Sequence, residues 1–233
     1  MNIAIIPARG GSKRLPNKNI KLMAGKPMIC WTIEAALTCN IFDHIFVSTD
    51  SEEIAKIAIE SGAVVPFLRP ASLSSDEAST YDVVSHLIDW FESEHEEKVN
   101  TITILQPTSP LRTAEDIKNV FGIINNHTAN AVISICPLEY PLEFCNTLNK
   151  GNTMKDFIKP ENIKRSQLVR PAYRVNGAIY LMKREMINNG KNIYSESTLP
   201  YIMSAKSSVD IDTLDDFEYA EYLMKKSLGT LYK

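Results

Sequence analysis

The amino-acid sequence predicts an α/β protein with a mainly parallel sheet and helices on both faces. Short apolar runs of strand length alternate with longer segments of helical period along the chain, a pattern typical of such sheets. With 233 residues, 44% hydrophobic and 23% charged, the chain has the composition of a folded protein. We therefore expect a single domain over residues 1–233.

Five apolar runs are the expected strands. They are short and bounded by polar or turn-forming residues, as buried strands are. In chain order they comprise residues 2–6, 44–48, 101–105, 131–135 and 177–182.

Four segments carry apolar residues at helical spacing, which predicts helices packed against the sheet. The expected inward faces are Ile29, Ile33, Ala36 and Leu37; Tyr81, Val84, Ile88 and Phe91; Ile117, Val120, Phe121 and Ile124; and, in a last helix after Asp212, Phe217, Ala220 and Met224.

Residues 137–171 interrupt this alternation. The segment is rich in Pro, Asn and Lys and has only short apolar clusters. Inserts of this kind cross to a partner or cover a site, although a wandering surface loop is an equal alternative.

Charge and cysteine usage restrict the function classes. A formal charge of -3 creates no basic field for nucleic acid, so phosphate binding would depend on locally placed Arg and Lys. The four cysteines include no Cys-x-x-Cys pair and the four histidines lack metal-ligand spacing, which favours buried free thiols in a reducing cytoplasm. The apolar start is too short for a signal peptide, and residues 119–138 are too polar for a membrane span.

The loop after the first strand is a candidate phosphate site. Residues 7–19 read PARGGSKRLPNKN, and paired glycines with Arg and Lys let backbone amides and cations approach phosphate oxygens. In an open parallel sheet this loop lies at the ligand-binding edge. The P-loop and dinucleotide-fold motifs are both missing, and a solvated basic turn is the alternative.

Six strings together resemble the CMP-sugar synthetases, especially the acylneuraminate cytidylyltransferases. They are ARGGSK with KN (8–13, 18–19), STD (48–50), LRPA with SD (68–71, 75–76), LQPTSPLR (105–112), RVNGAIY (174–180) and DID (210–212). The resemblance spans the chain and implies a Rossmann-like nucleotide-diphospho-sugar transferase fold. It also implies a homodimer formed through the insert at 137–171.

The resemblance assigns the nucleotide half of a site. It implies that the triphosphate is held by the first loop, with Asn19 placing the ribose or base and with Arg69 and the 75–80 stretch reading cytosine. Lys13 would stabilise the charge that builds on the α-phosphate and on the departing pyrophosphate. The alternative for residues 74–76 is a cap for the helix that begins near Ser79. The implied nucleotide-binding residues are Ala8, Arg9, Gly10, Ser12, Lys13, Lys18, Asn19, Arg69, Ala78 and Thr80.

The acceptor sugar is an acid, so its carboxylate needs a cation. Arg165, Arg170 and Arg174 cluster in the sequence, and at least one of them should reach it. Two prolines direct the hydroxyls of residues 108 and 109 toward a cleft, unless the segment is only a turn into a helix at Thr113. The implied sugar-binding residues are Gln106, Ser109, Arg165, Arg174, Asn176 and Tyr180.

Asp210 and Asp212 flank Ile211 in a strand-like run, so both carboxylates share one face. Two hard oxygen ligands suit Mg²⁺. From the residues alone, capping of the last helix by Asp212 is the stronger interpretation, whereas the resemblance favours metal binding. Asp210 would be a catalytic residue together with Arg9 and Lys13, either as metal ligand or as base.

The implied reaction couples CTP to a nonulosonic (sialic-acid-like) acid and releases pyrophosphate. A 3-deoxy-manno-octulosonate enzyme is the nearest alternative, and a non-catalytic CTP-binding protein is another. A non-catalytic protein would be expected to lack some of the charged residues of the site. All five of them are present: Arg9, Lys13, Lys18, Asp210 and Asp212. Ile193 and Tyr194 stand where sialic-acid enzymes can carry two Phe, so legionaminic or pseudaminic acid is also an option as substrate.

Overall fold

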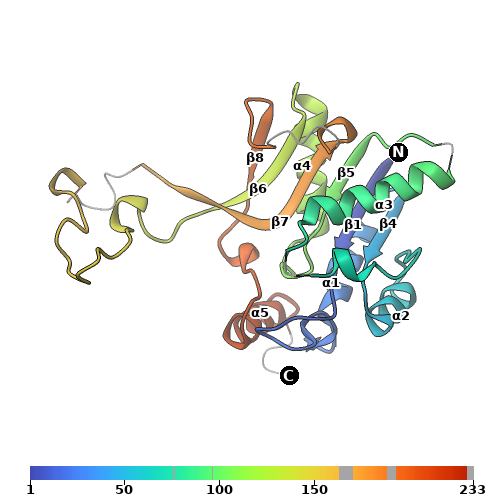
Figure 1. The fold of residues 1–233 in the computed structure, drawn as a ribbon, viewed down its shortest axis with the longest axis horizontal. Coiled ribbons are helices and arrows are strands. Elements are labelled where there is room, and N and C mark those ends of the chain that lie inside the picture. The colour runs from blue at the N-terminus through green and yellow to red at the C-terminus, as the bar shows by residue number, and fades with distance from the viewer. Residues whose placement is uncertain (76, 96, 163–169, 188–192, 230–233) are drawn as a thin grey trace.

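The computed structural model describes residues 1–75, 77–95, 97–162, 170–187 and 193–229, and these residues build one six-stranded sheet (Figure 1). Its strand order is β4-β1-β5-β7-β6-β8. The strands are β1 Asn2–Pro7, β4 His44–Ser48, β5 Thr101–Ile104, β6 Ala131–Pro137, β7 Tyr173–Lys183 and β8 Thr198–Ile202. Only β7 among them runs antiparallel to its neighbours. The predicted mainly parallel sheet is confirmed. A separate two-stranded ribbon joins β2 (Leu22–Met23) to β3 (Lys26–Pro27).

Helices cover both faces of the sheet, as predicted. They are α1 Met28–Thr38, α2 Glu52–Glu60, α3 Thr80–Glu94, α4 Ala114–Asn126 and α5 Leu214–Ser227. Ala4 and Ile6 of β1 pack in the core cluster of α1, α2 and α4. The alternate residues Ile3 and Ile5 pack in the cluster of α3, because side chains alternate across a strand. Helix α3 lies against the sheet in Figure 1. Helix α5 packs on the first loop through a third cluster that includes Leu15 and Phe217.

Three helices begin with a capping box. Ser79, Thr113 and Thr213 are the N-caps of α3, α4 and α5, and each exchanges hydrogen bonds with an Asp three residues later. Caps by residues 74–76 and by Asp212 were the alternatives from sequence. Ser79 and Thr213 take those places instead, because the capping side chain must stand immediately before the first helical residue.

Some elements depart from the predictions. Helix α2 and strand β8 were not predicted, and β7 begins at Tyr173 rather than at 177 because it also pairs with the end of β6. Two residues assigned to inward helix faces, Leu37 and Tyr81, are 41% and 38% exposed. Leu37 lies at the margin, where a Cβ on Gly62 would come within 3.2 Å of it.

The thiols are free, but not all are buried. Cys39 and Cys136 are buried and Cys30 is half-buried, whereas Cys145 is exposed, so the expectation of four buried thiols is wrong there. Cys145 lies in a segment with few packing neighbours, the arm described next. Of the helices in the described parts of the chain, none is long and apolar enough to cross a membrane.

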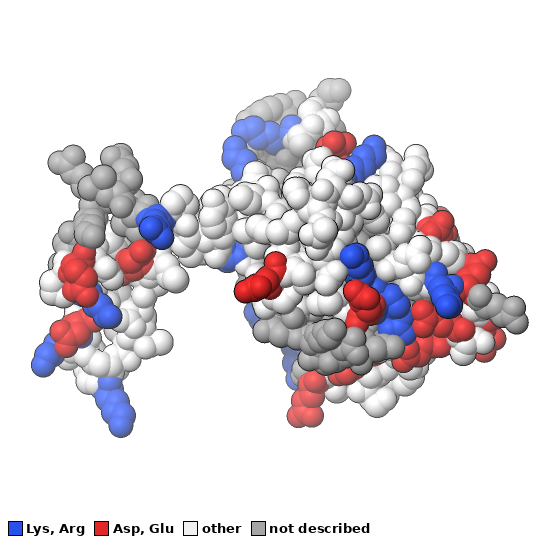
Figure 2. Space-filling view, turned by 90° about the horizontal axis from the view of Figure 1, so that it is seen from above, with Lys and Arg blue, Asp and Glu red and all other residues white. Residues whose placement is uncertain are grey.

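The described residues between β6 and β7, 138–162 and 170–172, belong to an arm that projects from the body (Figure 1). The two strands carry it outward as a ribbon, with Pro137 paired to Tyr173 and the Leu138 amide donating to the Ala172 carbonyl at 2.8 Å. Figure 2 shows the arm standing clear of the body.

Candidate active site

The carboxyl ends of β1, β4 and β5 meet at one edge of the sheet. Their register is level, since Ile3 pairs with both His44 and Ile102. Hydrogen bonds join the segments that follow: the Ala8 amide donates to Ser48 at 2.9 Å and the Ile211 amide to Thr108 at 2.9 Å. This edge is where open α/β sheets bind ligands.

The first loop is held in a fixed shape. The Gly10 amide donates to Asp50 Oδ1 at 2.8 Å, and the Ser12 amide donates to the Gly10 carbonyl at 3.0 Å. Asn19 is buried, and its Nδ2 donates to the Arg9 carbonyl at 2.9 Å. Its Oδ1 has no partner among the described residues. The structure thus gives Asn19 a role in shaping the loop, and the expected ribose or base contact stays a prediction.

A cavity of about 240 Å³, here the Arg69 cavity, opens beside this loop. Arg69 is buried, and its Nε donates to Ser74 Oγ at 3.2 Å. Burial lowers the pKa of Arg69, nearby Asp50 raises it, and the like charge of Arg9 lowers it again. Two guanidinium groups therefore converge on one cavity, which suits an anionic ligand. The lining residues are Pro7, Arg9, Arg69, Leu73, Ser75, Ala78, Thr80, Val83 and Gln106.

A second cavity of about 160 Å³, here the Tyr180 cavity, adjoins the first. Thr80 and Gln106 line both. Burial raises the pKa of Tyr180 to about 12, and Tyr194, Tyr81 and Asp210 act in the same direction. The phenol is therefore a neutral hydrogen-bonding group at ordinary pH. The lining residues are Thr80, Tyr81, Ile104, Gln106, Tyr180 and Tyr194.

The acidic segment is tied to the first loop. Lys18 Nζ donates to the Ile211 carbonyl at 2.6 Å and lies 3.5 Å from Asp212 Oδ1, and Arg14 pairs with Asp212 Oδ2 at 2.9 Å. Residues 210–212 lie outside any strand, yet Ile211 is fully buried between its two polar neighbours. Lys18 therefore connects two parts of the site, and its contact with a triphosphate stays a prediction.

The donor set fits a shared cation better than a closed metal cage. Among the residues that the structure describes, no group of three or more His, Cys, Asp or Glu is placed to hold an ion. Asp210 is exposed and forms no ion pair with any described residue. It fits Mg²⁺, which keeps waters and shares phosphate oxygens. Asp212 fits less well, because two cations already neutralise it.

The geometry disfavours two of the predicted sugar contacts, Asn176 and Ser109. Asn176 is buried, and its amide group uses all of its hydrogen-bonding capacity within the protein. Its Oδ1 accepts from Ser134 Oγ at 2.6 Å and from the Ala178 amide at 3.2 Å, while its Nδ2 donates to Ser208 Oγ at 2.8 Å and to Met203 Sδ at 3.3 Å. Ser109 is 0% exposed, so its hydroxyl faces the interior rather than a cleft.

Of the three arginines predicted to meet the sugar carboxylate, the structure describes Arg170 and Arg174. Arg174 is exposed, and its NH2 group donates a hydrogen bond to the Ser208 carbonyl at 3.0 Å. Ser208 ends the short helix η7 (Lys206–Ser208), which precedes Asp210. Arg170 is exposed near the start of β7. Arg165 lies outside the described residues. Which arginine meets the carboxylate stays a prediction.

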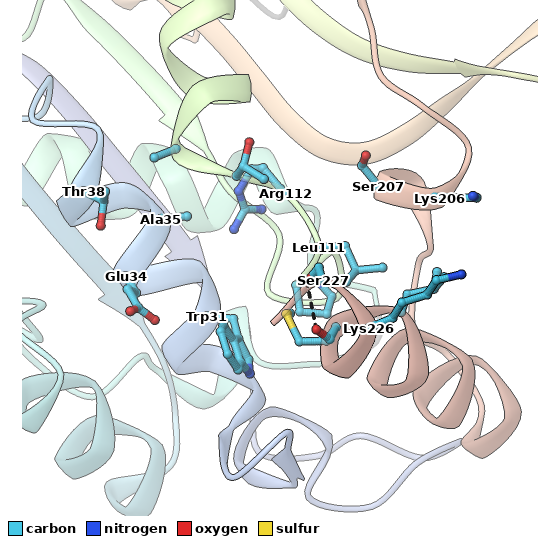
Figure 3. Close-up of a pocket in the computed structure, with 15 residues that line it drawn as sticks. Trp31, Glu34, Ala35, Thr38, Leu111, Arg112, Lys206, Ser207, Lys226 and Ser227 are labelled. Atoms are coloured by element: carbon cyan, nitrogen blue, oxygen red, sulfur yellow. Dashed lines mark hydrogen bonds between the residues drawn. The ribbon is translucent and has the colours of Figure 1, made fainter. Parts of the chain in front are cut away.

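A larger cavity of about 550 Å³ lies elsewhere, between α1, the turn before α4 and the end of α5 (Figure 3). Arg112 is buried at its wall, and NH1 donates to the Gln106 and Ala178 carbonyls at 3.2 and 3.1 Å. Burial lowers the pKa of Arg112 to about 10, against the opposing effect of Asp116. Arg112 therefore fixes the loop that carries Gln106. None of the predicted site residues that the structure describes lines this cavity.

Sequence reasoning gave no role to several residues at the site. Asp50 contacts the first loop, Arg14 pairs with Asp212, and Tyr81 lines the Tyr180 cavity. A signal existed for Asp50, because it follows the strand at 44–48 and so lies at the same sheet edge as the loop. Tyr81 was assigned to a buried helix face, since spacing cannot separate a core contact from a cavity wall.

Comparison with known proteins identifies the family of this chain. A family model described as Cytidylyltransferase matches residues 3–233. The CMP-N,N'-diacetyllegionaminic acid synthase of Legionella pneumophila is 38% identical over 229 residues, 96% of each chain. A pseudaminic acid cytidylyltransferase of Campylobacter jejuni is 34% identical and likewise covered at 96% of both chains. An N-acylneuraminate cytidylyltransferase of Streptococcus agalactiae is 38% identical over 92% of this chain, which spans only 51% of that protein.

Solved structures share the fold at lower identity. CMP:2-keto-3-deoxy-manno-octonic acid synthetase complexed with CTP has a TM-score of 0.71 at 18% identity, covering 97% of this chain and 99% of that one. The 4-diphosphocytidyl-2C-methyl-D-erythritol synthase of Anaerococcus prevotii has a TM-score of 0.65 at 12% identity, covering 96% and 98%. These likenesses concern the fold, whereas the family match and the relatives concern ancestry. The chain belongs to the cytidylyltransferase family.

Proposed function

We propose that this enzyme transfers CMP from CTP to a nonulosonic acid, a sialic-acid-like sugar used in cell-surface glycans. The anomeric C2 hydroxyl attacks the α-phosphorus, a new C–O–P linkage forms, and pyrophosphate leaves. The observation that carries this proposal is the pair of adjoining cavities, with Thr80 and Gln106 on their shared wall. The names of the relatives, which act on legionaminic, acylneuraminic and pseudaminic acids, support it.

The Arg69 cavity is proposed for the nucleotide. Arg9 and Arg69 supply positive charge, and Ala78 and Thr80 line the wall where cytosine would be read. Lys13 is exposed on the loop, and its compact ammonium group would follow the charge onto the departing pyrophosphate. Transfers of this type depend mainly on positioning and electrostatics.

The Tyr180 cavity is proposed for the sugar, in particular for its N-acyl substituent. Three tyrosines, Tyr81, Tyr180 and Tyr194, give the cavity an aromatic lining. A 3-deoxy-manno-octulosonate has no N-acyl group to fill it. This lining therefore favours an N-acylated nonulosonic acid over that alternative.

Mg²⁺ is proposed as the cofactor, held by Asp210 and by triphosphate oxygens. When bound, it would polarise the α-phosphate and lower the pKa of a coordinated hydroxyl. Asp210 could instead accept the proton of the C2 hydroxyl. We place the enzyme in the cytoplasm, where free thiols persist.

A homodimer is also proposed, with the arm as the contact. The arm exposes Tyr140, Leu142, Leu148 and Met154, each between 56% and 67%. Large exposed apolar side chains gathered on one element are typical of interaction sites.

The proposal is tested by mixing the protein with CTP, Mg²⁺ and a panel of acids and measuring pyrophosphate release. We expect release with at least one N-acylated nonulosonic acid, and much slower release with 3-deoxy-manno-octulosonate or with UTP. The Lys13→Ala variant should bind CTP and lose about 100-fold or more in kcat. No release with any acid would contradict the proposed activity.

A further inference from the structure

Asp50 lies behind the Arg69 cavity, where it contacts both the first loop and Arg69. It follows β4 at the same sheet edge as the first loop. Its Oδ1 accepts a hydrogen bond from the Gly10 amide at 2.8 Å, and the same atom lies 4.0 Å from Arg69 NH2. The side chain of Asp50 is 29% exposed and that of Arg69 only 5%. One carboxylate oxygen thus faces both the loop and the arginine.

The charge of Asp50 offsets a repulsion. Arg69 is buried next to Arg9, and both effects lower its pKa, whereas Asp50 alone raises it. The remaining contacts of Arg69 in the described structure are neutral: its Nε meets Ser74 Oγ at 3.2 Å, and its backbone amide meets the Thr49 carbonyl at 2.7 Å. A partly buried cation without its counter-charge is strongly disfavoured.

The contact with Gly10 fixes the other wall. Because the Gly10 amide donates to Asp50, it holds the shape of the loop. The loop also lies tightly on the start of α2, since a Cβ on Gly10 would come within 3.1 Å of Ser51 Cβ. Asp50 therefore sets the distance between the first loop and Arg69 on the opposite wall of the cavity.

We propose that Asp50 is a positioning residue that tunes the affinity for CTP. It rests on the proposed function, because the Arg69 cavity must be the nucleotide site. Asp50 touches neither substrate. It orients Gly10 and Arg69, so its removal acts on nucleotide binding and leaves the sugar half and the transfer step largely unchanged.

Three variants separate its charge from its hydrogen bond. Asp50→Asn keeps an acceptor for the Gly10 amide and loses the charge, Asp50→Ala loses both, and Asp50→Glu restores the charge. We expect the Kd for CTP, measured by titration calorimetry without sugar, to rise about 10-fold for Asn and about 100-fold for Ala, with Glu weaker than wild type but tighter than Asn. At saturating CTP, kcat and the KM for the sugar should stay within about 3-fold.

A matched control lies at the other end of the same strand. Asp43 precedes β4, and its Oδ2 accepts from the Asn2 amide at 2.6 Å. Asp43→Asn removes the charge of another carboxylate that accepts a backbone amide, far from the cavity, and should leave CTP binding unchanged. Urea unfolding of every variant checks that each protein is folded when its affinity for CTP is measured.

The outcomes distinguish this inference from the proposed function. If the wild-type protein does not bind CTP, the proposed function fails. If the wild type binds and Asp50→Asn binds equally well, the role of Asp50 is overturned. An equal loss for Asp43→Asn, or a fall in kcat with an unchanged Kd for CTP, would overturn it too. Should Asp50→Ala fail to fold, the Asn and Glu variants decide the question.

Discussion

Asn176 illustrates, at the scale of one residue, how a polar side chain in a site motif can serve the fold. Gly177 follows it with a φ of +77°, and the pairing of β6 with β7 shifts register between Ile133 and Ile135. Such a bulge removes ladder hydrogen bonds. The Asn176 amide replaces them through its bonds to Ser134 and Ala178, and it anchors Ser208 shortly before Asp210.

We predict that Asn176→Ala lowers stability rather than sugar affinity. The change leaves the buried Ala178 amide without its acceptor and removes one hydrogen bond from each of two buried serines, so the free energy of unfolding should fall by about 2–4 kcal/mol. Urea unfolding measures this, and Asn149→Ala in the exposed arm should cost about 0.5 kcal/mol or less. A large rise in the KM for the sugar with normal stability would restore Asn176 to the sugar contacts.

Much of the candidate nucleotide wall could be predicted from sequence. Arg9, Arg69 and Gln106 come from three separate strings, Ala78 and Thr80 come from the stretch at 75–80, and all five line one cavity. A string does not tell which way each side chain points in a bulged strand or a tight turn. For that reason the burial of Asn176 and Ser109 and the dual contact of Asp50 could not be predicted.

At the scale of elements, prediction worked where burial is complete. β1 buries Ile3 to Ile6 without interruption, and such a run is visible in the sequence. β8 is an edge strand that contains Pro200 and has no buried residue, so it shows no strand pattern. The nine-residue α2 is shorter than a reliable helical pattern requires.

The start of α5 positions the acidic segment, and it should respond to pH. Asp216 Oδ2 accepts from the Thr213 amide at 2.8 Å, the Thr213 hydroxyl at 2.7 Å and the Asp212 amide at 3.2 Å. The bond from the Thr213 side chain lowers the pKa of Asp216, although burial opposes it. Because the pKa of Asp216 is lower in the folded state than its ordinary value of 3.8, the ionised carboxylate stabilises the fold at pH values above 3.8.

We therefore predict a stability difference that disappears in acid. Asp216→Asn should cost about 1 kcal/mol near neutral pH. The difference from wild type should shrink as pH falls below 3.8, through the folded pKa, because protonated Asp216 resembles the amide. Urea unfolding across this range measures it. Asp215→Asn is the control, because Asp215 is an exposed carboxylate in the same first turn. An equal loss of stability for Asp215→Asn would show that the effect comes from the overall negative charge of the turn and not from the hydrogen bonds of Asp216.

At the scale of the whole molecule, the arm is the part whose apolar side chains are not covered by the rest of the chain. It stands clear of the body on the β6-β7 ribbon (Figures 1 and 2) and exposes large apolar side chains that the body does not cover. Its boundaries coincide with the interruption of the hydrophobic pattern at 137–171, but sequence shows no partner. Exposed side chains of this size lose contact with water when a second copy packs on them.

We predict that the chain sediments as a dimer, with twice the 26.2 kDa mass of one chain, and that the arm is responsible. Leu142→Glu combined with Met154→Glu places like charges in the contact, which should shift the mass to that of one chain. Ile59→Glu with Tyr222→Glu changes two exposed apolar residues on α2 and α5 and should leave the dimer intact. Because the arm lies outside the sheet core, all variants should unfold at similar urea concentrations. A wild-type monomer would contradict the predicted dimer, and a dimer broken only by the α2 and α5 changes would place the interface elsewhere.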